Sequence, residues 1–279
     1  MSTFLRVKND DKQEIISFLA KNDEIKKKEY EKFFKLQSLI SQKNSFYGWC
    51  IRDHENKVRG FLGALTHQSP HHKNKLIVNM TNWEVCEKYR SMSLGLLGKF
   101  IKNNSYIYTN YSASKDVQKI LPYFGFKEID KGTNVFSSYK SLKFTLSFRL
   151  KFGKDAINEF VGTDHEKIIN DHLRIGCIFV VSFNRGYLFF KQKKFPFNSF
   201  FLIHVINFST KSFRTDWKKI CSFAFFRHLS SKIFIDKRFS PAKIKPCQFK
   251  KKKMFMKGEL IKSMMLTRAY SEPLQKLMK

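Results

Sequence analysis

The chain has 279 residues, of which 42% are hydrophobic and 16% aromatic, including 31 phenylalanines. This composition excludes a chain that is disordered throughout, because disordered chains are poor in the aromatic residues that a core buries. Lys and Arg number 53 against 23 Asp and Glu, a formal charge of +30, which indicates nucleic acid or an anionic membrane surface as a partner class.

Strands and helices alternate in the first part of the chain. Asp11-x-x-Glu14 has the form of an acidic capping box, and Ile15 and Leu19 follow at helical spacing. A second helix is expected from Asp23, with one apolar face. The strands expected in this part lie at residues 3–7, 45–51, 60–66 and 76–85.

The next segment predicts two further helices. Ser91 or Ser93 is expected to cap a helix that carries apolar residues up to Ile101. After a strand at residues 106–111, Ser114 is expected to cap a short helix that ends or kinks at Pro122, which lacks the N–H to continue it. Residues 125–126 and 135–139 are expected to begin and end a closing pair of strands.

The second half of the chain repeats, in shorter form, the order of strands and helices expected in the first half. Asn184-Arg185-Gly186 predicts a hairpin between two apolar runs. A nearly continuous apolar strand at residues 200–208, a helix after Ser212 and a strand at 233–235 follow. We therefore expect two domains, residues 1–145 and a smaller, related one at residues 146–279.

The five cysteines are widely spaced, and their number is odd: Cys50, Cys86, Cys177, Cys221 and Cys247. No C-x-x-C pair is present, so the sequence supports neither a disulfide framework nor a zinc site, and no metal is expected. The N-terminus lacks the apolar run of a signal peptide. No stretch has the roughly 20 apolar residues of a membrane helix. A cytoplasmic location with free thiols is the expectation.

The segment from Leu76 to Ile129 carries the chemistry. A strand leads through Arg90 into a helix that opens with small residues, and a helix N-terminus offers unpaired N–H groups to a phosphate. This segment resembles the GNAT superfamily of acyl-CoA N-acyltransferases, whose pattern is Arg/Gln-x-x-Gly-x-Gly/Ala after a strand. Arg90 matches the first position of the pattern, Ser93 the first glycine and Gly95 the last. The closing Gly-Phe pair of the family matches Gly125-Phe126.

The resemblance implies an α+β fold with a mixed sheet flanked by helices. It also implies acetyl-CoA or another acyl-CoA as co-substrate and an amine, such as an amino sugar, as acceptor. The backbone from Ser91 through Met92, Ser93 and Leu94 to Gly95 would hold the pyrophosphate beside Arg90. The strand Met80–Val85 would bond the pantetheine arm through its main chain, and a backbone N–H near Val85 would face the thioester carbonyl. Thr81–Val85, Tyr89–Leu94 and Tyr108–Asn110 further resemble a bacterial subgroup that accompanies surface-polysaccharide synthesis.

Two positions depart from the family pattern. Ser93 replaces the first glycine, and Leu121 stands where the family often has a tyrosine as general acid. Glu84 is the candidate general base, because a carboxylate on this strand can reach an amine through a water. The competing interpretation of Glu84 is a solvated strand carboxylate.

A second function remains open from the charge. Residues 243–262 hold eight lysines and one acid, including Lys250–Lys253, and suit phosphates or anionic lipid headgroups. A non-catalytic basic protein that binds nucleic acid or a membrane surface is therefore the alternative. An A/T-rich genome, which favours the codons of Lys, Phe, Asn and Ile, accounts for the same charge without any function.

Overall fold

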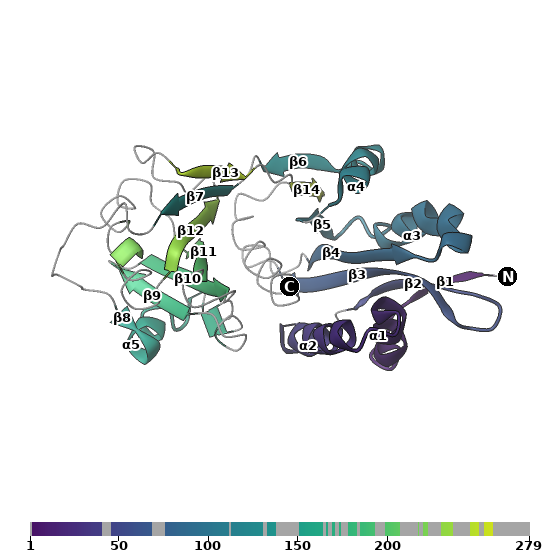
Figure 1. The fold of residues 1–279 in the computed structure, drawn as a ribbon, viewed down its shortest axis with the longest axis horizontal. Coiled ribbons are helices and arrows are strands. Elements are labelled where there is room, and N and C mark those ends of the chain that lie inside the picture. Colours follow the sequence, from purple (N-terminus) through teal and green to yellow (C-terminus); the bar gives the residue numbers. More distant parts are fainter. Residues whose placement is uncertain are drawn as a thin grey trace. The chain divides into compact units, whose positions relative to one another are not determined.

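The computed structural model describes residues 2–40, 46–68, 76–111, 113–130, 133–137, 151–163, 178–182, 185–192, 199–206, 230–236, 246–250 and 254–258. It also describes residues 166, 169–170, 173, 217 and 220–222. These residues form two compact units (Figure 1). The first unit comprises Met1–Asp130 and Lys253–Lys279, and the second comprises Lys131–Lys252. The boundary expected near residue 145 falls in 138–150, outside the described residues.

The first unit is built on a mixed sheet of seven strands among the described residues. Neighbouring strands of this sheet are antiparallel, except that β4 and β5 are parallel. In spatial order the strands are β1 (Thr3–Arg6), β2 (Gly48–Arg52), β3 (Val58–Gln68), β4 (Leu76–Val85), β5 (Ile107–Asn110), β14 (Met254–Lys257) and β6 (Lys127–Asp130).

Helices cover both faces of this sheet (Figure 1). On one face lie α1 (Lys12–Ala20) and α2 (Glu24–Ile40), where the ring of Phe34 lies 6.4 Å from that of Phe61 on β3. On the other face α3 (Ser93–Phe100) buries Leu96 and Leu97 against the core residue Met80 of β4. The described part of this unit also holds three short helices: η1 (Glu87–Met92), α4 (Lys115–Ile120) and η2 (Leu121–Phe124).

The start of α1 is held by an ion-pair network rather than by a capping box. Asp11 occupies the N-cap position, but its side chain makes no capping bond. Its carboxylate accepts a bond from the Lys8 N–H at 2.7 Å and one from Arg52 at 2.9 Å. Glu14 pairs with Arg52 at 2.6 Å and accepts the Val58 N–H at 3.0 Å. The capping-box prediction is wrong because the buried guanidinium of Arg52 takes both carboxylates, and a buried charge needs such partners.

The second unit holds another mixed sheet, again with seven strands in the described part of the chain. The predicted hairpin forms, since β9 and β10 pair antiparallel from Ser182 and Arg185, but Arg185 and Gly186, which were expected in the turn, belong to β10. A short helix, α5 (Gly153–Asn158), lies in the same unit. In spatial order the strands are β13 (Gln248–Lys250), β7 (Thr133–Ser137), β12 (Ser230–Asp236), β11 (Ser199–Ile206), β10 (Arg185–Gln192), β9 (Ile178–Ser182) and β8 (Lys151–Phe152).

The two sheets share one pattern of pairing directions. Counted from β1 and from β8, three antiparallel pairs are followed by one parallel pair and two antiparallel pairs. The sixth position comes from elsewhere in the chain in both sheets: β14 fills it in the first and β7 in the second. The expected pair of closing strands is therefore wrong, because β6 pairs with β14 while β7 pairs with β12 and β13.

Candidate functional site

A β-bulge interrupts β4 close to its end. Leu62 of β3 faces Trp83, whereas the next residue, Gly63, faces Thr81, so Asn82 is the extra residue. Asn82 has a φ of +42°, in the left-handed region that Asn enters more readily than most residues. A bulge bends the strand and redirects the side chains beside it. Because Asn82 is an extra residue, Thr81 and Trp83 lie opposite consecutive residues of β3, and their side chains point to opposite faces of the sheet.

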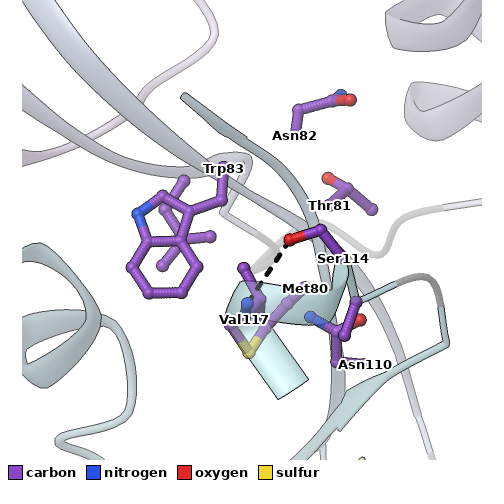
Figure 2. A pocket seen from close by; sticks show the side chains of 9 residues that line it. Met80, Thr81, Asn82, Trp83, Asn110, Ser114 and Val117 are labelled. Carbon is purple, nitrogen blue, oxygen red and sulfur yellow. Dashed lines mark hydrogen bonds between the residues drawn. The ribbon is translucent and has the colours of Figure 1, made fainter. Parts of the chain in front are cut away.

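The bulge coincides with an opening between the two parallel strands. Pairing between β4 and β5 covers only Ile77 to Asn79, so β4 continues past the bulge without β5 beside it in this register. A pocket of about 160 Å³ lies at this place (Figure 2). It is lined by Leu62, Met80, Thr81, Asn82, Trp83, Asn110, Ala113, Ser114 and Val117. Four residues of the strand expected to bond the pantetheine arm belong to this lining (Met80, Thr81, Asn82 and Trp83), whereas none of the residues expected to hold the pyrophosphate does.

Three polar atoms of β4 around the pocket have no hydrogen-bond partner: the hydroxyl of Thr81, the amide nitrogen of Asn82 and the indole nitrogen of Trp83. All three are buried, and Thr81 as a whole is only 6% exposed. Leaving a buried polar group unpaired costs about 1–3 kcal/mol. A bound molecule with carbonyl oxygens would pair with these groups only if the side chains that cover them moved.

The far wall of the pocket is the start of α4. The Ser114 hydroxyl accepts the Val117 N–H at 3.3 Å, which confirms the predicted cap (Figure 2). Gly125 then ends η2 at a φ of +79°, in the left-handed conformation that glycine adopts without strain. Leu121, at the position of the general acid of the family, is buried in the core and carries no phenol. The phenol of Tyr123 faces solvent, since this residue is 90% exposed.

The segment expected to bind phosphate begins its helical turns earlier than predicted. η1 starts at Glu87 and runs directly into α3 at Ser93, whose N–H donates to the Arg90 carbonyl. Cys86 and Met92 occupy the two N-cap positions, and neither side chain caps. The predicted caps Ser91 and Ser93 are therefore wrong, because the chain already turns helically before it reaches them.

The individual phosphate-site candidates differ in exposure. Arg90 is 73% exposed at the side chain and lies 4.0 Å from Glu87. Ser91, Leu94 and Gly95 are exposed, while Met92 and Ser93 are half-buried. A Cβ at Gly95 would come within 3.0 Å of the Phe4 ring of β1. Glycine at this position thus lets β1 approach α3, and the phosphate site itself stays a prediction.

Glu84 lies on the α1–α2 face of the sheet. It faces Phe61 in the β3–β4 register, and its carboxylate pairs with the ammonium of Lys21. That hydrogen bond, and then the negative charge of Glu84, raises the pKa of Lys21. Tyr30 of α2 lies near both groups, and burial followed by the charge of Glu84 raises the pKa of its phenol. The role of Glu84 as a base stays a prediction, and Val85 follows it as the last residue of β4.

Sequence reasoning pointed to residues 80–85 but missed the bulge at Asn82, the pocket residues Asn110, Ala113 and Val117, and the pairing of Lys21. Thr81-Asn82-Trp83 held one signal, an Asn within an apolar strand, which is typical of a bulge or turn. Within the described ranges, no group of three His, Cys, Asp or Glu side chains is placed to hold a metal ion. Among the helices of those ranges, none has the length and apolar character to cross a membrane.

By sequence, the chain matches no family model and no curated protein. By structure, it is similar to a GCN5-related N-acetyltransferase from Anabaena variabilis at 12% identity and a TM-score of 0.60, covering 92% of this chain and 72% of that one. It is also similar to one from Kribbella flavida at 11% identity and a TM-score of 0.58, covering 96% and 73%.

A third similar structure is the GCN5-related glucosamine N-acetyltransferase region of a fungal multi-domain GH3 β-N-acetylglucosaminidase. The identity is 11% and the TM-score 0.55, covering 92% of this chain and 38% of that longer one. These likenesses agree with the mixed sheet and its flanking helices. The chain therefore has the α+β fold of the GCN5-related N-acetyltransferases, the GNAT fold.

Proposed function

We propose that this protein transfers an acyl group from acyl-CoA to an amine. The observation that carries the proposal is the pocket beside the bulge of β4, with unpartnered polar atoms on Thr81, Asn82 and Trp83. The pantetheine arm of CoA is a slender chain with two amide carbonyls. Its carbonyl oxygens can accept hydrogen bonds from the amide of Asn82 and the indole of Trp83.

The chemistry needs no covalent intermediate on the protein. An acceptor ammonium on the α1–α2 face gives a proton to Glu84, and the neutral amine attacks the thioester carbonyl through the opening between β4 and β5. A backbone N–H near Val85 stabilises the oxyanion that forms. The carbon–sulfur bond then breaks, and the CoA thiolate leaves and is protonated. Arg90, with the backbone of Ser91–Gly95, holds the pyrophosphate of the bound acyl-CoA.

The acceptor in this proposal is an amino sugar, in a bacterial cytoplasmic protein of surface-glycan synthesis. Two observations support this choice. The sequence resembles the subgroup that accompanies such synthesis, and one structural neighbour is described as a glucosamine N-acetyltransferase region. An acetyl group is the expected cargo, because the structural neighbours are described as N-acetyltransferases.

The second candidate function is non-catalytic binding of nucleic acid or an anionic membrane surface. The formal charge of +30 and the absence of a phenol at the pocket, with Tyr123 facing solvent, favour it. Half of the lysine-rich segment 243–262, with six of its eight lysines, lies outside the described residues. This function predicts binding to nucleic acid that weakens steeply as salt increases, or flotation with liposomes that depends on acidic lipid.

Calorimetry with acetyl-CoA, longer acyl-CoAs and free CoA tests the main proposal. Ala113→Leu narrows the pocket and should abolish measurable acetyl-CoA binding. Arg90→Glu should weaken binding about tenfold, which is about 1.4 kcal/mol. Lys102→Glu is the matched control, since it makes the same charge change at an exposed site just after α3 and should leave binding unchanged. Gly95→Glu is unsuitable because it disturbs the contact with Phe4.

The parent binding no acyl-CoA would refute the acyltransferase proposal. Equal binding by Ala113→Leu would separate the pocket from the CoA site. Equal weakening by Arg90→Glu and Lys102→Glu would show that only overall charge matters, which favours the second candidate. Product formation from acetyl-CoA and glucosamine, followed by mass spectrometry, tests the acceptor.

A further inference from the structure

The turn between α1 and α2 has an unusual backbone. Lys21 and Asn22 are both left-handed, with φ values of 50° and 66°. Glycine or asparagine normally takes such positions after a helix, so the lysine pays a conformational cost. Non-glycine residues held in this region are concentrated at functional sites. Lys21 is thus the residue of this turn whose presence needs an explanation.

Hydrogen bonds fix the turn from both of its helices. The N–H of Lys21 donates to the Ser17 carbonyl at the end of α1, at 3.2 Å. Asp23 accepts the N–H groups of Ile25 and Lys26, at 3.0 and 3.1 Å, and so caps α2. The position of the Lys21 Cα is therefore set by the two helix ends, and its long side chain extends from a defined starting point.

The side chain of Lys21 reaches the candidate base. Its ammonium pairs with Glu84, with 69% of the Lys21 side chain and 31% of the Glu84 side chain exposed. Tyr30 of α2 lies close enough for the charges of both groups to act on its pKa. Glu84 directly follows Trp83 of the pocket, on the opposite face of β4. An ammonium ion therefore already occupies the carboxylate that an acceptor amine would need.

We propose that Lys21 is a built-in competitor of the acceptor: its ammonium occupies the Glu84 subsite, and a primary ammonium substrate must displace it there. This inference rests on the proposed function, in which Glu84 takes the proton of the acceptor. Exposed ion pairs are weak because water and salt screen them, so one ammonium replaces another readily. The acceptor class follows as a primary amine that is protonated in solution, and Lys21 sets the affinity for it.

Binding of n-butylammonium, which copies the four-carbon stem of lysine, tests the inference without any acyl-CoA. NMR titration should show about tenfold tighter binding to Lys21→Met than to the parent, because Glu84 is then free. Lys21→Arg keeps a cation at Glu84 and should bind like the parent. Lys26→Met is the matched control, since Lys26 pairs with Asp23 at 3.5 Å on the same turn. It should also bind like the parent.

Two results would overturn the inference: equal binding by Lys21→Met and the parent, or unchanged binding by Lys21→Met carrying Glu84→Gln. Glucosamine as a second probe tells whether the subsite accepts an amine on a ring carbon. In the acylation assay Lys21→Met should lower the acceptor KM about tenfold. Calorimetry with acetyl-CoA keeps the two proposals apart. A parent that binds no acyl-CoA refutes the acyltransferase, whereas the n-butylammonium titration still reports on Lys21 and Glu84.

Discussion

Replacing Thr81 by valine separates the stability of the pocket from its binding function. Valine has nearly the volume of threonine, but it carries a methyl group where the hydroxyl stood. That hydroxyl is buried and has no hydrogen-bond partner, and Thr81 is 6% exposed. We therefore expect Thr81→Val to make the free protein more stable and to weaken its binding of acyl-CoA.

Both magnitudes follow from the hydrogen bond that is missing. An unpaired buried polar group costs about 1–3 kcal/mol, and its removal should recover about 1 kcal/mol. For a unit of this size, that raises the melting temperature by about 2–4 °C. A hydrogen bond to the ligand contributes about 0.5–1.5 kcal/mol. Its loss should weaken acyl-CoA binding by about two- to tenfold.

Two other threonines of the same sheet serve as matched controls. Thr66 is fully buried and also lacks a partner for its hydroxyl, but it does not line the pocket. Thr66→Val should therefore stabilise the protein equally and leave ligand binding unchanged. Thr109 donates to the side-chain oxygen of Asn79 at 3.2 Å. Thr109→Val breaks that bond and should destabilise the protein by about 1–3 kcal/mol.

Scanning calorimetry without ligand and titration with acetyl-CoA give the two measurements for each variant. If Thr81→Val lowers the melting temperature as Thr109→Val does, the hydroxyl has a partner in the free protein. If Thr66→Val weakens acetyl-CoA binding as much as Thr81→Val, the effect is not local to the pocket. Either result refutes the reasoning from unpartnered groups.

Two further predictions concern titrating groups. Burial by itself would raise the pKa of Asp53, but the Arg59 bond at 2.6 Å and the N–H groups of Lys57 and Glu55 lower it overall. A lowered pKa stabilises the fold above the unfolded value of about 3.9 and ceases to do so as the pH falls through the folded value. Asp53→Asn should therefore melt below the parent at pH 6–8, and the difference should shrink as the pH falls below about 4; a difference that is as large at pH 2 as at pH 7 would contradict this. Burial raises the pKa of the Cys50 thiol to about 11, so iodoacetamide at pH 8 should modify the exposed Cys247 and spare Cys50 in the native protein, as read by mass spectrometry. Equal labelling of the two thiols would contradict the burial of Cys50.

Local patterns predicted much of the first unit. The strand at residues 76–85 has the bounds of β4, and Ser114 caps α4 as expected. Ile15 and Leu19 are buried on α1 as their helical spacing indicated. These features depend on neighbours within a few residues, because helix and strand periodicity and capping are local effects.

Predictions that depended on distant partners went wrong. Asp11 and Glu14 were expected to cap α1, but Arg52, 41 residues after Asp11, recruits both. β6 and β7 are adjacent in sequence but lie in different sheets, since β14 takes the place beside β6. A sequence pattern shows that a strand will form, but it does not show which strand will pair with it.

The charge of +30 follows from the sequence alone, whereas the candidate site depends on both the sequence and the tertiary structure. The sequence by itself determined the composition, most elements and the resemblance of the segment around Arg90 and Gly95 to a phosphate-binding motif. Only the tertiary structure decided that Asn82 bulges against β3, that β4 and β5 open a pocket there, and that Lys21 pairs with Glu84. The physical reason is that register, burial and ion pairing are properties of residues brought together by folding, and no local pattern encodes the partner of a buried or charged group.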